Sequence, residues 1–144
     1  MTKGLNWRGF VAVGVGGVLG CWLRYVLSTV FNSLSPHLPP GTLAANWIAA
    51  FFIGCLVGIF QRFETLPMEL RLFTTTGILG GLSTYSTFSA EAVTLLLAGH
   101  YDWFAVHIFS HLIGSLALTL LGIYLVHAVL SKRYQEMDNP EPEK

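Results

Sequence analysis

The sequence predicts an all-α membrane protein with four transmembrane helices. Of its 144 residues, 53% are hydrophobic and only 11% are charged, whereas soluble domains carry about 25% charged residues. Four apolar stretches are each long enough to cross a bilayer, for which about 20 residues suffice at a rise of about 1.5 Å per residue. The few charges lie at the ends of these stretches and in the tails, so no basic face indicates nucleic-acid binding.

The four predicted spans form one transmembrane domain at residues 1–131. They run at about 10–31, 42–60, 72–98 and 103–130. The first connection contains three prolines, the second carries charges and Pro67, and the third is little more than GHYD, so each ends a helix. Residues 132–144 are polar and proline-bearing, and we expect them to form a disordered tail.

In each of the first two spans, residues spaced by four positions occupy one helical face, and most of them are small. The first face carries Gly16 and Gly20 and ends at Arg24, and the second begins at Asn46 and carries Ala50, Gly54 and Gly58. Because such faces let backbones approach closely in lipid, we expect the glycines to serve helix packing. Arg24 and Asn46 need another explanation, since polar side chains inside a span are costly. Arg24 either reaches the headgroups or has a functional role, whereas Asn46 is too short to reach far.

A line of polar residues follows one face of the fourth span. Its members, spaced by four, are His107, His111, Ser115 and Thr119. Four hydrogen-bonding side chains in register favour an aqueous or ion-lining track. Metal ligation by the two histidines is less favoured, because no Cys, Asp or Glu accompanies them at ligand spacing.

The third span contains TTTGILGGLSTYSTFS at residues 74–89, where glycines and hydroxyls interrupt the apolar pattern. Gly80 and Gly81 favour a broken helix, whose free carbonyls suit a cation and whose free N–H groups suit an anion. The alternative is a helix that only bends, because the hydroxyls bond back to carbonyls one turn earlier. Tyr85 and Phe88 follow at a spacing of three, and their ring edges carry the partial positive charge that stabilises an anion.

Three motifs together resemble those of the Fluc (CrcB-type) fluoride channels of bacteria. They are GGVLGCWLRY at 16–25, GTLAANWIAAFFIG at 41–54 and GILGGLSTYSTFSAE at 77–91. The resemblance, which spans all four helices, implies an antiparallel dimer whose third helices break mid-membrane and cross at one structural sodium ion. It also implies a multi-pass protein of the cell (inner) membrane that exports fluoride passively through two pores, which limits fluoride toxicity.

The resemblance further implies roles for individual residues. It assigns the sodium ion to the backbone carbonyls of Gly80 and Ser83, and a vestibule or structural position to Arg24. The residues that it implies for the fluoride pore are Asn46, Tyr85, Ser86, Thr87, Phe88, His107, His111 and Ser115. This chain has Tyr85 where the family usually has phenylalanine, and it has two histidines in the fourth-helix track, where other members vary.

Positive charges are concentrated at one end of the predicted bundle. They are Lys3, Arg8, Arg62, Arg71, Lys132 and Arg133, whereas the two opposite loops contain no Lys or Arg. The positive-inside rule therefore predicts that both termini are cytoplasmic. An antiparallel homodimer needs half of its copies inverted, so the partner is either a second copy that overrides this bias or a closely related chain.

Two other functional classes stay open. A proton-coupled small exporter needs a membrane carboxylate, for which Glu91 is the only candidate. A non-conducting accessory subunit explains the glycine faces but not the polar lines. An enzyme is not expected, because the sequence has no nucleophile with a plausible base, no phosphate-binding glycine loop and no strong metal cluster.

Overall fold

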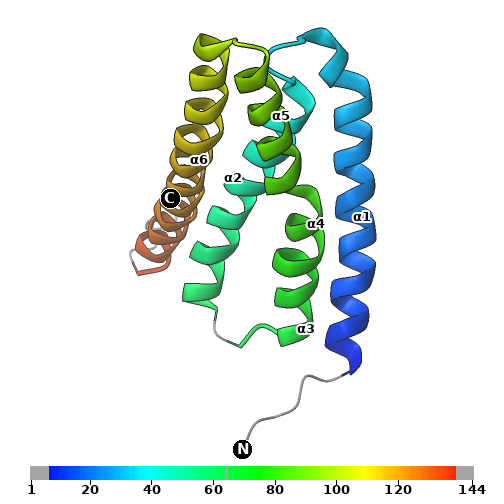
Figure 1. Cartoon of the computed structure of the whole chain (residues 1–144). Helices are drawn as coiled ribbons and strands as arrows, with labels where there is room; N and C mark the ends of the chain where they lie inside the picture. Colours follow the sequence, from blue (N-terminus) through cyan, green and yellow to red (C-terminus); the bar gives the residue numbers. More distant parts are fainter. Residues whose placement is uncertain (1–6, 64, 139–144) are drawn as a thin grey trace, which may run out of the picture.

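The computed structural model describes residues 7–63 and 65–138, with the backbone alone for 133–138. These residues form helices and the connections between them. Three helices are long and apolar enough to cross a membrane, at Trp7–Leu34, Pro40–Arg62 and Tyr101–Lys132. The third predicted span consists instead of shorter helices that follow one another along a single rod of the bundle (Figure 1).

The rods run alternately up and down the bundle (Figure 1). Helix α1 (Trp7–Phe31) leads through a 3-10 turn, η1 (Asn32–Leu34), into α2 (Pro40–Arg62). The next rod comprises α3 (Met68–Arg71), the π-helical η2 (Leu72–Leu79), α4 (Gly80–Leu82) and α5 (Tyr85–Leu97). Helix α6 (Tyr101–Asp138) then returns to the end of the bundle at which α1 begins. The α2–α3 connection lies at the same end (Figure 1). The helix segments that carry Arg8, Arg62, Arg71 and Lys132 therefore gather there, as the four-span prediction requires, whereas Lys3 lies outside the described residues.

Helix α6 is longer than its sequence predicted. It continues to Asp138, past the expected end at Leu130. The segment SKRYQEMD that follows Leu130 contains no glycine or proline and is rich in good helix formers, so the helix persists after the apolar residues stop. The tail expected to be disordered at 132–144 is therefore helical as far as Asp138, and residues 139–144 lie outside the described part of the chain.

Glycines bring the helices into backbone contact in two pairs. On α1, a Cβ added to Gly16 would lie 2.6 Å from the carbonyl oxygen of Phe73, and one added to Gly20 would overlap that of Ile78. On α2, a Cβ at Gly54 would overlap the backbone of α6. The predicted packing role of the glycine faces is confirmed, because any larger side chain would push these helices apart.

The rod made of α3, η2, α4 and α5 is interrupted at Ser83 and Thr84. Both residues are extended, with φ, ψ of −72°, 153° and −147°, 122°. Gly80 by contrast is helical, at −66°, −36°, and a Cβ on Gly81 would lie only 2.6 Å from the carbonyl oxygen of Gly17. The prediction of a break between Gly80 and Ser83 is confirmed at Ser83, but the glycine pair itself is helical. Gly81 permits close packing against α1, whereas Gly80 is exposed and a Cβ on it would meet only the carbonyl oxygen of Thr75, at 3.5 Å, in its own rod. The helix breaks after both glycines.

Candidate functional site

The interruption between α4 and α5 is held open by a side chain from α2. Asn46 Oδ1 accepts a 2.7 Å hydrogen bond from the backbone N–H of Thr84, and Asn46 Nδ2 donates to the carbonyl of Thr84 at 3.0 Å. Thr84 is buried, so without Asn46 its N–H would lack a partner, at a cost of about 1–3 kcal/mol. Its carbonyl would keep one partner, because Thr84 is the N-cap of α5 and its carbonyl accepts the first intrahelical bond. Thr84 Oγ1 also accepts the N–H of Thr87 and so caps the start of α5.

A cavity of about 350 Å³ lies beside this interruption, between α2, α5 and α6. Its polar lining consists of Asn46, Ser83, Thr84, His111, Ser115 and Thr119. The rings of Tyr85 and Phe88 line it too, with ring centroids 5.7 Å apart. Tyr85 is 79% exposed, whereas Phe88 is buried. Phe88 stacks on the imidazole of His107 at 5.2 Å and with an interplanar angle of 10°.

The hydrogen bonds fix which nitrogen of each histidine carries a proton. Asn46 Nδ2 lies 3.1 Å from His111 Nδ1, and because an amide nitrogen can only donate, Nδ1 accepts and the proton of the neutral ring sits on Nε2. His107 Nε2 lies 3.2 Å from the carbonyl oxygen of Phe88, which can only accept, so here Nε2 is protonated and Nδ1 carries a lone pair. One histidine therefore presents an unpartnered donor and the other an unpartnered acceptor.

Glu91 is the main site residue that sequence reasoning undervalued, since it was considered only as the carboxylate of an exporter. Its Oε1 accepts a 2.7 Å hydrogen bond from Thr42 Oγ1, and its Oε2 lies 3.8 Å from His107 Nε2. Thr42 and Thr84, both buried, were also missed. Spacing in the sequence could have identified two of these residues. Thr42 precedes Asn46 by one turn of α2, and Glu91 follows Phe88 by three positions on α5, so each shares a helical face with a predicted site residue.

The predicted site residues fall into two groups. Those that line the cavity are Asn46, Ser83, Tyr85, Phe88, His111 and Ser115. Those that do not line it are Arg24, Gly80, Ser86, Thr87 and His107. Of the second group, Ser86 and Thr87 lie within 3.3 Å and 3.0 Å of the hydroxyl of Thr84. Arg24 is half-buried on α1, where its guanidinium donates to Cys21 Sγ at 3.6 Å.

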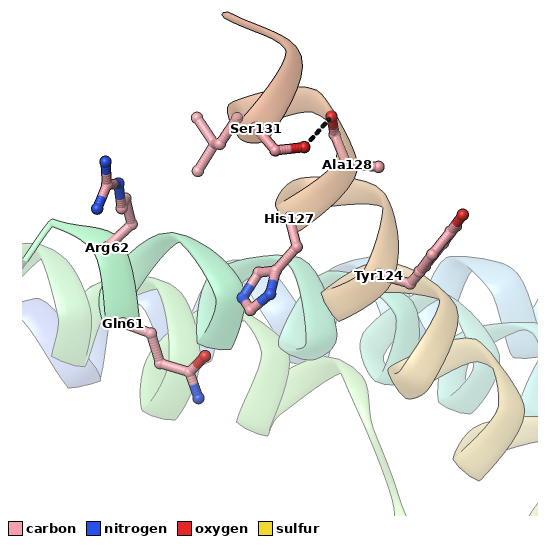
Figure 2. A pocket seen from close by; sticks show the side chains of 7 residues that line it. Gln61, Arg62, Tyr124, His127, Ala128 and Ser131 are labelled. Carbon is pink, nitrogen blue, oxygen red and sulfur yellow. Dashed lines mark hydrogen bonds between the residues drawn. The ribbon is translucent and has the colours of Figure 1, made fainter. Parts of the chain in front are cut away.

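A larger groove of about 670 Å³ lies at the charged end of the bundle (Figure 2). It is lined by Gln61 and Arg62 at the end of α2 and by Tyr124 and His127 on α6. None of the predicted site residues lines it. Size alone therefore does not select the functional site in this chain, and the smaller cavity at the interruption is the stronger candidate.

Comparison with known proteins identifies the family of this chain. Residues 11–123 match the family described as CrcB-like protein, Camphor Resistance (CrcB). Three similar proteins, each named fluoride-specific ion channel FluC, come from Nitrosospira multiformis (55% identity over 80% of this chain and 90% of the relative), Cupriavidus taiwanensis (53%, over 81% and 92%) and Escherichia coli (48%, over 83% and 94%). The match covers the segments that build the cavity and its interruption. This chain therefore belongs to the CrcB family.

Proposed function

We propose that this chain is a subunit of a passive, fluoride-selective channel in the cell (inner) membrane, which exports fluoride and so limits its toxicity. The observation that carries the proposal is the cavity beside Ser83 and Thr84, whose lining combines hydrogen-bond donors with aromatic rings and contains no Lys, Arg, Asp or Glu. The names of the similar proteins, which cover most of the chain at about half identity, support the same ion.

The chemistry of fluoride explains why such a lining suits it. Fluoride is small and holds its water tightly, so a pore must replace that water with close donors, yet release the ion at each step. The first turn of α5 supplies free backbone N–H groups at the positive end of the helix dipole. His111 Nε2–H adds a donor, and the ring edges of Tyr85 and Phe88 add partial positive charge. The hydroxyls in this proposed path are those of Ser86, Thr87 and Ser115.

Asn46 and His107 act in this proposal mainly by positioning their neighbours. All the donors of Asn46 are engaged, by the Thr84 carbonyl and by His111 Nδ1, so its contribution is to hold the interruption open and to keep the proton of His111 on Nε2. His107 stacks on Phe88 and donates to its carbonyl, which fixes the ring. Arg24 supplies positive charge near one end of α1, where it would attract anions from solution.

We propose further that two subunits pair in antiparallel orientation. Tyr85 and Gly80 are exposed on this single chain, and irregular polar backbone at membrane depth is tolerated only where protein, water or an ion covers it. The partner is a second copy or a closely related chain. The charge bias toward one end of the bundle favours cytoplasmic termini, so tagging the C-terminus and scoring its accessibility from each side of intact cells tests the choice. Exclusively cytoplasmic tags would exclude a dual-topology homodimer.

A structural sodium ion fits the same arrangement. In a continuous helix the N–H of Thr84 would donate to the carbonyl of Gly80, but here it donates to Asn46. The carbonyl of Gly80 thereby loses its helical donor, and the carbonyl of Ser83 loses its own because the N–H of Thr87 donates to Thr84 Oγ1. Both carbonyls suit a hard cation as oxygen ligands, as unwound backbone does in other membrane proteins. When bound, sodium would tie the interrupted helices of two subunits together and would not itself be transported.

The test of the channel is fluoride efflux from liposomes that contain the purified chain, recorded with a fluoride electrode, with chloride efflux recorded in parallel. We expect fluoride efflux without any imposed proton gradient, and little chloride efflux. Folded protein that passes no fluoride would refute the proposal.

One observation favours a second candidate, the proton-coupled exporter. Glu91 lies beside His107 within the bundle, and such titratable pairs serve as proton relays in transporters. Efflux that appears only when a proton gradient is imposed would favour this candidate over the channel.

A further inference from the structure

Two histidines and one carboxylate meet where α5 packs against α6. Glu91, His107 and His111 each offer one ligand atom, and these atoms all lie within 4.8 Å of one another. The two histidines are 0% and 4% exposed, and the side chain of Glu91 is 17% exposed. Along α6 no carboxylate accompanies the histidines, so the sequence disfavours metal ligation. In three dimensions Glu91 supplies that carboxylate from α5, and the expectation is corrected.

The three side chains share a second property, which is that each has one buried polar atom without a hydrogen-bond partner. These atoms are Glu91 Oε2, His107 Nδ1 and His111 Nε2. The opposite end of each group is held: Thr42 donates to Glu91 Oε1 at 2.7 Å, the Phe88 carbonyl accepts from His107 Nε2 at 3.2 Å, and Asn46 contacts His111 Nδ1 at 3.1 Å. Burying polar atoms without partners costs about 1–3 kcal/mol each, so a group of three calls for an occupant.

We propose that Glu91, His107 and His111 form a binding site for a first-row transition-metal cation of the Zn²⁺ class. Two imidazoles and one carboxylate form a ligand set that zinc uses with a fourth position open. Sodium, calcium and magnesium prefer sites made of oxygen atoms, so these ions are not expected here. His107 already has the arrangement typical of a metal ligand, because its Nε2–H donates to a carbonyl and its Nδ1 lone pair is free.

Binding requires a small contraction and one rearrangement. Ligand atoms on a tetrahedral zinc ion lie about 3.3 Å apart when the bonds are about 2.0 Å long, so atoms that lie within 4.8 Å of one another must close by at most about 1.5 Å. His111 must also move its proton from Nε2 to Nδ1 before Nε2 can ligate, which ends the hydrogen bond from Asn46 Nδ2. The metal and the Asn46–His111 hydrogen bond therefore exclude each other.

This exclusion connects the metal site with the cavity. Asn46 also holds the extended backbone of Thr84, and Phe88 lies 5.2 Å and 4.8 Å from the two imidazoles. His111 itself lines the cavity, which gives the ion a route to the site. A bound cation would thus disturb the interruption and the ring of Phe88, and we expect it to inhibit fluoride flux. The inhibition rests on the proposed function, whereas the binding does not.

Metal binding is measured on the purified, tag-free full chain in detergent, by Zn²⁺ titration calorimetry and by the visible absorption of Co²⁺, which reports tetrahedral nitrogen and oxygen ligation. We expect one ion per chain with micromolar affinity. Glu91→Gln and His107→Gln should each weaken binding at least about tenfold, since even partners of metal ligands are worth about 10–100-fold. Asn46→Ala should tighten it, because His111 is then free to change tautomer. The matched control is His127→Gln, a histidine on the same helix but in the groove of Figure 2, which should leave the affinity unchanged.

Well-folded protein that binds neither Zn²⁺ nor Co²⁺ would overturn the site, as would binding that survives both Glu91→Gln and His107→Gln. Zn²⁺ added to liposomes provides the functional readout, with inhibition expected for the unmodified chain and its relief for Glu91→Gln. If the ion binds to protein that conducts no fluoride even without metal, the proposed function fails while the metal site stands.

Discussion

Replacing Asn46 by alanine tests whether one side chain holds the interruption between α4 and α5. The change removes the acceptor of the Thr84 N–H at 2.7 Å and the donor to the Thr84 carbonyl at 3.0 Å. The unsatisfied N–H costs about 1–3 kcal/mol, and the lost hydrogen bond to the carbonyl, which keeps its intrahelical partner as the N-cap of α5, costs about 0.5–1.5 kcal/mol, so the sum is about 1.5–4.5 kcal/mol. We expect the lower half of this range, about 1.5–3 kcal/mol, because the adjoining cavity lets water reach the freed N–H.

The control for this experiment is Asn32→Ala. Asn32 makes a similar pair of hydrogen bonds, accepting from the N–H of Thr42 at 3.0 Å and donating to its hydroxyl at 3.1 Å, but it lies at the end of the bundle rather than at the interruption. Because Thr42 is also buried, this substitution should cost a similar amount, about 1.5–3 kcal/mol, while it leaves the interruption in place.

Stability is measured by reversible unfolding of the detergent-solubilised protein in SDS, and fluoride efflux is measured on the same variants in liposomes. Asn46→Ala should slow efflux at least about tenfold, which corresponds to about 1.4 kcal/mol in barrier height, whereas Asn32→Ala should retain efflux. If Asn46→Ala conducts at the original rate, or if Asn32→Ala slows efflux as much as Asn46→Ala does, the reasoning about the interruption is wrong.

Three further predictions concern the pore, the packing and the sodium ion. Phe88→Ile should largely abolish fluoride flux and leave the dimer intact, since it removes the ring edge but keeps the apolar bulk. The control Phe109→Ile, which replaces a side chain 61% exposed on α6, should leave the flux unchanged. Equal flux in the two variants would contradict the role given to the Phe88 ring. Gly20→Val should lower the free energy of unfolding by at least about 1–3 kcal/mol through overpacking, because the new Cβ would overlap the carbonyl of Ile78. The control is Gly14→Val, whose Cβ would meet nothing within 4 Å. Equal unfolding curves for the two variants would contradict the proposed packing of α1. Replacing sodium by a bulky organic cation should weaken the dimer in a subunit-exchange assay, and an unchanged exchange rate would argue against the structural ion.

Hydropathy and spacing predicted the parts of the fold that depend on local sequence. The spans follow from the need to cross about 30 Å of lipid, and the glycine faces follow from the four-residue repeat that places Gly16 and Gly20 on one side of α1. The same repeat on α6 placed His111 and Ser115 together, and both line the cavity. These inferences needed no knowledge of how one helix sits against another.

The remaining features depend on such contacts and were out of reach. The helix breaks at Ser83 and Thr84 because Asn46, on another helix, satisfies the backbone there, so glycine propensity alone placed the start of the break too early, at Gly80. The meeting of Glu91 with His107 depends on the register between α5 and α6, which no spacing within one helix reveals.

The most direct test of the central claim is the reversal potential of current through the reconstituted protein in a planar bilayer. If the cavity is a passive fluoride path, the reversal potential follows the fluoride gradient, by about 59 mV per tenfold ratio for a monovalent ion, and does not respond to chloride or proton gradients. A reversal potential that follows the proton gradient, or folded protein that carries no fluoride current, would contradict the account.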